Sequence, residues 1–187
     1  MTKNEQYVAD HIATWVWAGF YKQSDIEQMI EDIVEEDCDL DELKSLVGPA
    51  LRAKLRAERG WPDSTDCDRL DKVFYNLHES GICALSNAGY TMSDGHTDVA
   101  EAVAQAPAGH YTGYCFYHGQ DVERAVAGDG VMIAFGDLAN NPGRNARVGQ
   151  VVSEALRAAG FAVDWNGSTE TRISLPAFDW KRRATRG

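Results

Sequence analysis

The hydrophobic pattern of this chain changes once, near Gly81, and this change constrains the fold more than any other feature. Before Gly81, apolar residues recur at the three- and four-residue spacing of amphipathic helices. After Gly81, they gather in short runs that alternate with helical segments, which is typical of strands connected by helices. The sequence therefore predicts an α+β protein, with a helical part over residues 1–81 and a mixed β-sheet with covering helices over residues 82–187. We expect the two parts to form one compact domain.

The clearest helix of the first part is predicted over residues 24–37. Ser24 followed by Glu27 has the pattern of a capping box, which satisfies two backbone groups at a helix N-terminus. The apolar positions that follow form one stripe, and all of them are expected to face the core: Ile26, Met29, Ile30, Ile33 and Val34. Further along, Gly48 and Pro49 predict a kink or a break in the helical pattern.

Short apolar runs after Gly81 are predicted to be strands, at residues 82–85, 114–117, 131–135, 161–165 and 171–175. A helix between the first two runs, over residues 98–106, predicts that these strands are adjacent and parallel, because such crossovers are short and right-handed. The helical pattern around residues 148–156 predicts a second parallel crossover, between the third and fourth strands. Asn166 and Gly167 signal a tight turn, so the last two strands are expected to pair as an antiparallel hairpin.

The charge of the chain disfavours one broad class of partner. Lys and Arg number 18 against 29 Asp and Glu, which gives a net charge of −11. No nucleic-acid partner is expected, because a phosphate backbone would be repelled. The acid is concentrated in one stretch, at Asp25, Glu27, Glu31, Asp32, Glu35, Glu36, Asp37, Asp39, Asp41 and Glu42. This stretch is either a face for a basic partner or, as is more common, a helix face solvated by water.

Cysteine usage and hydropathy favour a soluble protein in a reducing compartment. Cys38, Cys67, Cys83 and Cys115 are far apart and form no Cys-x-x-Cys pair. We therefore expect four free thiols and no metal site. The first ten residues are polar, and no apolar run is long enough to span a membrane. The predicted location is the cytoplasm, with no membrane partner.

The most suggestive polar cluster lies in residues 113–126, where an apolar strand ends and a short helix begins. Polar groups at the carboxyl end of a strand lie where open α/β sheets bind ligands. His118 could act as an acid or a base, Asp121 could orient it, and Arg124 could hold an anion. The alternative is structural, with Gln120 or Asp121 as an ordinary helix cap and Asp121 paired to Arg124 three residues on.

A second polar cluster, over residues 87–96, follows the first predicted strand and includes Tyr90 and Asp94. If the first two strands are adjacent, both clusters lie at the same edge of the sheet. The predicted site is then a partly exposed cleft lined by Tyr90, Asp94, Tyr117, His118, Gln120, Asp121 and Arg124. The alternative is a well-bonded loop in which Asp94 caps the next helix. The histidines lack the spacing of a metal site, and no metal is predicted.

Three runs of the sequence are distinctive: residues 65–71 (TDCDRLD), 87–95 (NAGYTMSDG) and 113–126 (GYCFYHGQDVERAV). In these runs, and over nearly its whole length, the chain resembles a bacterial family classed as a domain of unknown function. That family has no assigned activity. The resemblance therefore implies no catalytic residues that could be carried over to this chain.

Besides an interaction with a basic protein through the acidic stretch, two functions remain open after the sequence has been read. The first is a non-catalytic cytoplasmic protein that binds a small ligand or a protein partner. It is favoured because the sequence contains no P-loop, dinucleotide fingerprint or hydrolase motif, and no cofactor is predicted. The alternative is an enzyme for a small polar or anionic substrate, with His118 as general acid/base and Asp121 as its orienting group. A concave site that holds His118 beside a carboxylate would favour the enzyme, and a flat or filled site the binder. The oligomeric state stays open.

Overall fold

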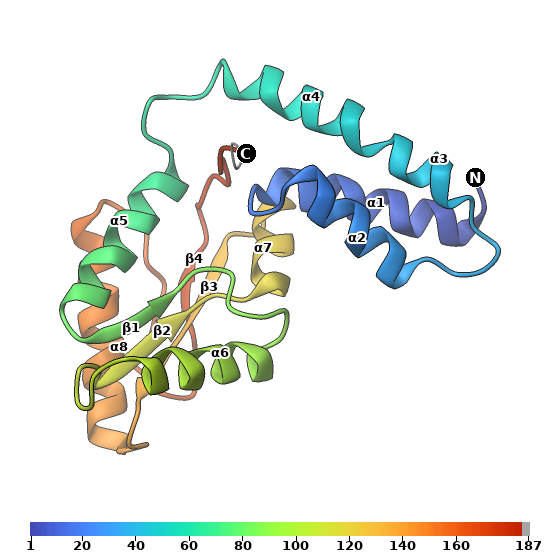
Figure 1. Cartoon of the computed structure of the whole chain (residues 1–187). Coiled ribbons are helices and arrows are strands. Elements are labelled where there is room, and N and C mark those ends of the chain that lie inside the picture. The colour runs from blue at the N-terminus through green and yellow to red at the C-terminus, as the bar shows by residue number, and fades with distance from the viewer. Residues whose placement is uncertain (185–187) are drawn as a thin grey trace. The chain divides into compact units, whose positions relative to one another are not determined.

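A computed structural model of the chain describes residues 1–184 and has the α+β architecture expected from the sequence (Figure 1). Its elements fall into two compact units. One unit comprises Met1–Thr65 together with the C-terminal segment that begins at Lys181, and the other comprises Asp66–Trp180. The first boundary lies before helix α5 (Asp66–Glu79), which packs against the sheet.

The first unit is a helical bundle of α1 (Lys3–Ala18), α2 (Gln23–Ile33), α3 (Leu40–Ser45) and α4 (Val47–Glu58). Its core contains Val8, Ile12, Trp15, Val16, Ile26, Ile30, Leu43 and Val47. Helix α1 ends at Gly19, which adopts the left-handed conformation (φ 83°) that favours glycine at this position. Lys54 is fully buried and donates a hydrogen bond to the Val16 carbonyl at 3.0 Å, so it helps to satisfy the end of α1.

Both ends of α2 differ from the sequence-based prediction. The predicted capping box at Ser24 is wrong: the N-cap is Lys22, whose backbone N–H donates to the Asp25 carboxylate at 2.9 Å. The helix ends at Ile33 and does not continue to residue 37. The carboxylates at residues 35–37 explain this early end, because negative charge is unfavourable at the C-terminal end of a helix dipole.

The early end of α2 also changes which of its apolar residues are buried. Ile26 and Ile30 are fully buried, and Met29 and Val34 pack against the core from its margin. Ile33 was predicted to face inward, but it is 37% exposed because it occupies the last position of the helix. The predicted apolar stripe is therefore confirmed only over its central part.

The break between the third and fourth helices falls at Leu46, before the predicted position at Gly48 and Pro49. Pro49 is the third residue of α4. A helix tolerates proline in its first turn, because the backbone N–H that proline lacks would have no partner within the helix.

The second unit is built on a mixed sheet of β1 (Ile82–Leu85), β2 (Gly113–Phe116), β3 (Val131–Asp137) and β4 (Ile173–Leu175), in the spatial order β1-β2-β3-β4. Strands β1 and β2 are parallel and are joined through α6 (Met92–Gln105), which confirms the first predicted crossover. Strand β3 is antiparallel to both of its neighbours. The intervening helices are α7 (Gly119–Val126), before β3, and α8 (Pro142–Ala158), after it.

The region after α8 departs from the prediction. Residues 161–165 form no strand, so the second parallel crossover is wrong, and the expected hairpin is reduced to one antiparallel bridge between Asp164 and Ser174. Phe161 is buried by side-chain packing without a backbone ladder, whereas Val163 and Trp165 are only partly buried. Phe161 stacks on Phe178, with ring centres 5.6 Å apart, and β4 pairs directly with β3.

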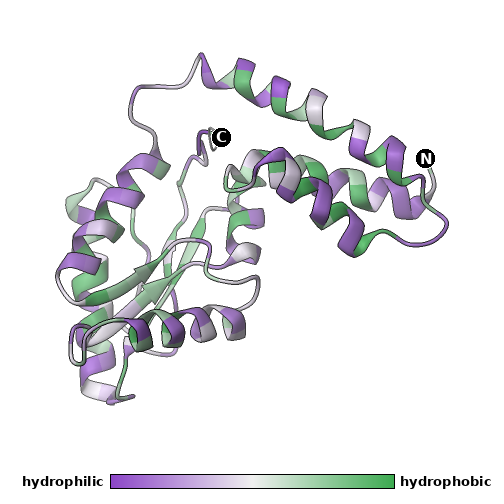
Figure 2. Ribbon diagram, in the orientation of Figure 1, coloured by the Kyte–Doolittle hydropathy of each residue, from purple (hydrophilic) through white to green (hydrophobic). Residues whose placement is uncertain are grey.

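Helices α5 and α8 cover one face of the sheet and α6 covers the other (Figure 1). Gly149 of α8 abuts the ring of Phe135, whereas Gly95 of α6 abuts the ring of Phe116. Figure 2 shows the strands as mainly apolar and the helices as mixtures of apolar and polar residues, as expected for helices that pack on one side only. Within residues 1–184, every helix is too short or too polar to cross a membrane.

The four cysteines are free thiols, and their accessibility leads to a prediction. Cys67, Cys83 and Cys115 are buried, and burial raises the pKa of the Cys83 and Cys115 thiols, so these react slowly. Only Cys38 is partly exposed. A thiol reagent should therefore modify Cys38 first in the native protein and reach all four thiols after denaturation. Fast modification of several thiols in the native state would contradict this assignment.

Candidate functional site

Two loops meet at the carboxyl ends of β1 and β2. The backbone N–H of Ala88 donates to the Tyr117 carbonyl at 2.9 Å, and the N–H of Gly119 donates to the Gly89 carbonyl at 2.9 Å. The loops approach so closely that a Cβ atom at position 119 would lie 2.8 Å from the ring of Tyr90. The loop after β1 therefore lies beside the first turn of α7, as the parallel crossover predicts.

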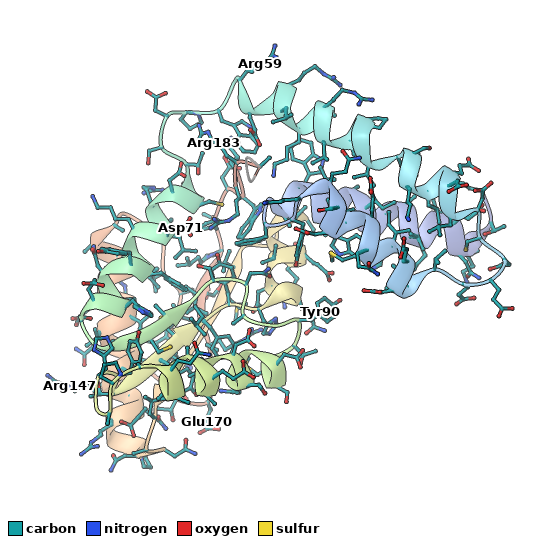
Figure 3. All side chains as sticks on the ribbon, viewed as in Figure 1. Arg59, Asp71, Tyr90, Arg147, Glu170 and Arg183 are labelled. Atoms are coloured by element: carbon teal, nitrogen blue, oxygen red, sulfur yellow. The ribbon has the colours of Figure 1, made fainter. Side chains whose placement is uncertain are left out.

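A cleft of about 530 Å³ opens at this junction, and its volume is within the range of small-molecule sites. It is lined by Tyr90, Met92, His118, Gln120, Asp121, Glu123, Arg124 and Arg172. Figure 3 shows Tyr90 on the loop between β1 and α6. Five of the residues expected at the site line the cleft, namely Tyr90, His118, Gln120, Asp121 and Arg124, whereas Tyr117 and Asp94 do not.

Tyr117 lies in the core and away from the cleft. It is fully buried, and its ring contacts those of Phe74 and Trp180, with centre-to-centre distances of 5.6 and 6.1 Å. Consecutive residues of an extended segment point to opposite faces of a sheet. Because His118 faces the cleft, its neighbour Tyr117 faces the layer formed by α5.

Asp94 has the structural role considered as the alternative. Its carboxylate accepts hydrogen bonds from the backbone N–H and the hydroxyl of Thr91, both at 2.9 Å, and so completes the capping box of α6. The hydrogen bond from the Thr91 backbone is the largest cause of the lowered pKa of Asp94. Asp94 therefore anchors the loop that carries Tyr90, which lines the cleft.

The centre of the cleft is a buried carboxylate that forms an ion pair with an arginine from a distant part of the sequence. Asp121 is 1% exposed, and Arg172 Nη1 donates to both of its carboxylate oxygens, at 2.8 and 2.9 Å. The backbone N–H of His118 donates to the same carboxylate at 3.2 Å. Arg124, the partner expected from the i,i+3 spacing, makes no ion pair with any residue that the structure describes. Arg172 was not identified from the sequence, although a buried carboxylate signals the need for a cation.

His118 is buried and is held by Asp121. Its Nε2 atom lies 3.2 Å from the Asp121 carboxylate, which favours the tautomer with the proton on Nε2. Burial is the largest influence on the pKa of His118 and lowers it; Asp121 raises it, and Arg172 lowers it again. The Nδ1 atom is shielded from solvent and has no hydrogen-bond partner among residues 1–184. His118 Nε2 therefore lies against the Asp121 carboxylate, with Arg172 Nη1 at 3.4 Å, and its second nitrogen is enclosed.

The stability of the protein should depend on pH through His118. Since its pKa is lower in the folded chain than in the unfolded chain, the unfolded chain binds the additional proton first, and stability rises with pH. The wild type is expected to lose stability as the pH falls from about 7.5 to about 5.5, across the pKa of an exposed histidine. His118→Asn should show a smaller loss over the same interval. Urea unfolding of both proteins measures this difference, and parallel pH profiles would exclude His118 as its source.

Several polar groups of the cleft make no hydrogen bond or ion pair within residues 1–184. Arg172 is 26% exposed at its side chain, and its Nε and Nη2 atoms donate to no residue of the described chain. Arg124 and Gln120 are exposed, and their side chains make no hydrogen bond within residues 1–184. Glu123 accepts a hydrogen bond from the Tyr90 hydroxyl at 3.1 Å. The cleft thus presents guanidinium and amide donors together with a carboxylate.

Two of the other histidines, His96 and His110, do not line this cleft. His96 packs edge-on against Tyr114 and Phe116, and His110 packs against Tyr111. Among the described residues, no group of three or more His, Cys, Asp or Glu side chains is arranged to hold a metal ion. The cleft itself is lined mainly by charged and hydrogen-bonding side chains.

The fold and the site define an α+β protein with a polar cleft at the carboxyl edge of a parallel strand pair. The chain belongs to the family described as Domain of unknown function (DUF6891), whose model matches residues 1–184. This confirms the resemblance to a domain-of-unknown-function family that the sequence suggested. The chain matches no curated protein and no solved structure.

Proposed function

We propose that the protein binds a small carboxylate-bearing ligand in this cleft without catalysing a reaction, and that Arg172 holds the carboxylate. The observation that carries the proposal is that only one of the three nitrogen atoms of the Arg172 guanidinium group is used by Asp121. Asp121 takes Nη1, and the edge formed by Nε and Nη2 has no partner within residues 1–184. This edge matches the geometry of a carboxylate, which it binds through two parallel hydrogen bonds.

Asp121 prepares Arg172 for this role. The carboxylate is buried and contacts Nη1 through both oxygens, so it limits rotation of the guanidinium group. A group that is already ordered loses less conformational entropy when a ligand binds. Because Arg172 retains partial exposure, a ligand can reach the unused edge from solvent.

The backbone of α7 argues for a carboxylate over a phosphate. Phosphates commonly bind to free N–H groups at a helix N-terminus. Here the backbone N–H of Gly119 donates to the Gly89 carbonyl at 2.9 Å, and the backbone N–H of Gln120 donates to the Tyr90 carbonyl at 3.1 Å. With those donors occupied, the arginine side chains supply most of the recognition, and the net charge of −11 disfavours a multiply charged anion.

An enzyme remains the second candidate, and one observation favours it. His118 Nε2 lies 3.2 Å from a carboxylate inside a concave site, which is the arrangement expected for an oriented general acid or base. However, Nε2 is engaged by Asp121 and Nδ1 is shielded from solvent, so neither nitrogen is available to a ligand. Binding without catalysis is therefore the better-supported function.

The proposal is tested by titrating the ¹⁵N-labelled full chain with propionate, 3-phenylpropionate and glutarate. Arg172→Lys keeps a positive charge beside Asp121 but removes the planar fork, and it should weaken carboxylate binding by about tenfold or more. Arg147→Lys is the matched control, because Figure 3 shows Arg147 on α8, away from Tyr90. The shifted resonances should belong to cleft residues, and the acids should be recovered unchanged. Equal affinity in the wild type and Arg172→Lys would contradict the proposal.

A further inference from the structure

Glu123 is the carboxylate of the cleft that has no cationic partner among the described residues. Asp121 is neutralised by Arg172, whereas the Glu123 side chain accepts a hydrogen bond from the Tyr90 hydroxyl. Glu123 is half-buried, so part of its hydration is lost in the folded chain. A partly desolvated carboxylate without a counter-charge attracts a cation.

Tyr90 adds a second feature that suits a cation. Its hydroxyl donates to Glu123 Oε2 at 3.1 Å and leaves Oε1 available to a ligand. The residue is 49% exposed and lines the cleft, so its ring offers an aromatic surface beside the carboxylate. A carboxylate next to an aromatic ring is a favourable environment for an ammonium group, which gains both ionic and cation–π attraction.

We infer that the natural ligand is a small zwitterion of the amino-acid class, with its carboxylate on Arg172 and its ammonium group at Glu123 and Tyr90. This inference rests on the proposed function and extends it by naming the second charged group of the ligand. Both charged ends of such a molecule find a partner in one cleft. The volume of about 530 Å³ leaves room for a side chain near Met92 and Gln120.

The charge pattern separates this ligand class from a simple carboxylic acid. An acid that lacks the amino group would satisfy Arg172 but would leave Glu123 without a counter-ion. A zwitterion compensates Glu123 as well, so the amino group should strengthen binding. A simple amine would meet Glu123 but also the repulsion of Arg124 and Arg172.

Matched pairs of ligands test the inference with the full chain. Each pair is an amino acid and the acid that lacks its amino group: alanine with propionate, phenylalanine with 3-phenylpropionate, and glutamate with glutarate. In at least one pair, the wild type should bind the amino acid about tenfold more tightly or better. Glu123→Gln retains an acceptor for Tyr90 but loses the charge, so it should abolish the preference for the amino acid over its matched acid. Glu154→Gln, an exposed substitution on α8, is the control.

The outcomes distinguish the two proposals. If the acids bind through Arg172 but no amino acid binds more tightly than its partner, the zwitterion is excluded and the carboxylate site stands. A preference that survives in Glu123→Gln would also exclude Glu123 as the ammonium site. If no member of any pair binds to the cleft, both the inference and the proposed function are wrong.

Discussion

Arg172→Gln should lower the free energy of unfolding by about 3 kcal/mol, which is a large fraction of the stability of a protein of this size. The reason is the position of Asp121. Its side chain is 1% exposed, and Arg172 supplies the cation that contacts both of its oxygens. Removal of that cation leaves a carboxylate in the protein interior with only the hydrogen-bonding groups of His118 beside it.

Urea unfolding at neutral pH measures this effect, and two further variants identify its cause. Arg172→Lys keeps the positive charge and should lose about 1 kcal/mol, since mainly hydrogen bonding is changed. The double variant Arg172→Gln with Asp121→Asn removes both charges and should recover most of the stability that Arg172→Gln loses. If the double variant is as unstable as Arg172→Gln alone, the loss does not come from an unpaired Asp121 carboxylate.

The same pair of residues shows how far the site could be predicted. His118 and Asp121 were found because a strand, a tight connection and a helix follow one another in the sequence, so the cluster depends on local structure. Arg172 lies 51 residues from Asp121 and directly precedes β4. Its position depends on how β4 pairs with β3, and the sequence near Arg172 contains no pattern that predicts this pairing.

Tyr117 marks a different limit of sequence-based reasoning. Its hydroxyl suggested a binding role, and it adjoins His118, but the alternation of side chains along an extended segment directs the two residues to opposite faces. The sequence already indicates which residues share a face: Cys115 and Tyr117 lie on one side of the extended segment, and Phe116 and His118 lie on the other. The correct choice required knowing which face is covered completely, and this is a property of the assembled layers.

The fold was predicted best where consecutive elements interact. The crossover from β1 through α6 to β2 was correct because it involves neighbours in the chain. The strand predicted at residues 161–165 was wrong: Phe161 is buried by ring stacking and Trp165 contacts Phe135, with ring centres 5.3 Å apart, so these side chains pack without a strand. A segment that packs into the protein interior can be apolar without forming a strand, so an apolar run alone does not identify a strand.

Ile30→Asp in the helical unit is expected to have an effect of comparable size, a loss of about 4 kcal/mol in the free energy of unfolding. Ile30 is fully buried in the core formed by α1, α2, α3 and α4. An aspartate at this position would place a carboxylate among apolar side chains and would also remove their packing contacts.

Ile33→Asp is the matched control, because it makes the same chemical change three residues away on the same helix. Ile33 is 37% exposed at the last position of α2, so its carboxylate would remain in water. The expected loss is about 1 kcal/mol or less, and part of it comes from placing a negative charge at the C-terminal end of a helix. Thermal and urea unfolding of both variants compare the two positions directly. Equal losses would mean that α2 does not pack through Ile30, and an unchanged melting temperature in Ile30→Asp would refute the burial of this helix face altogether.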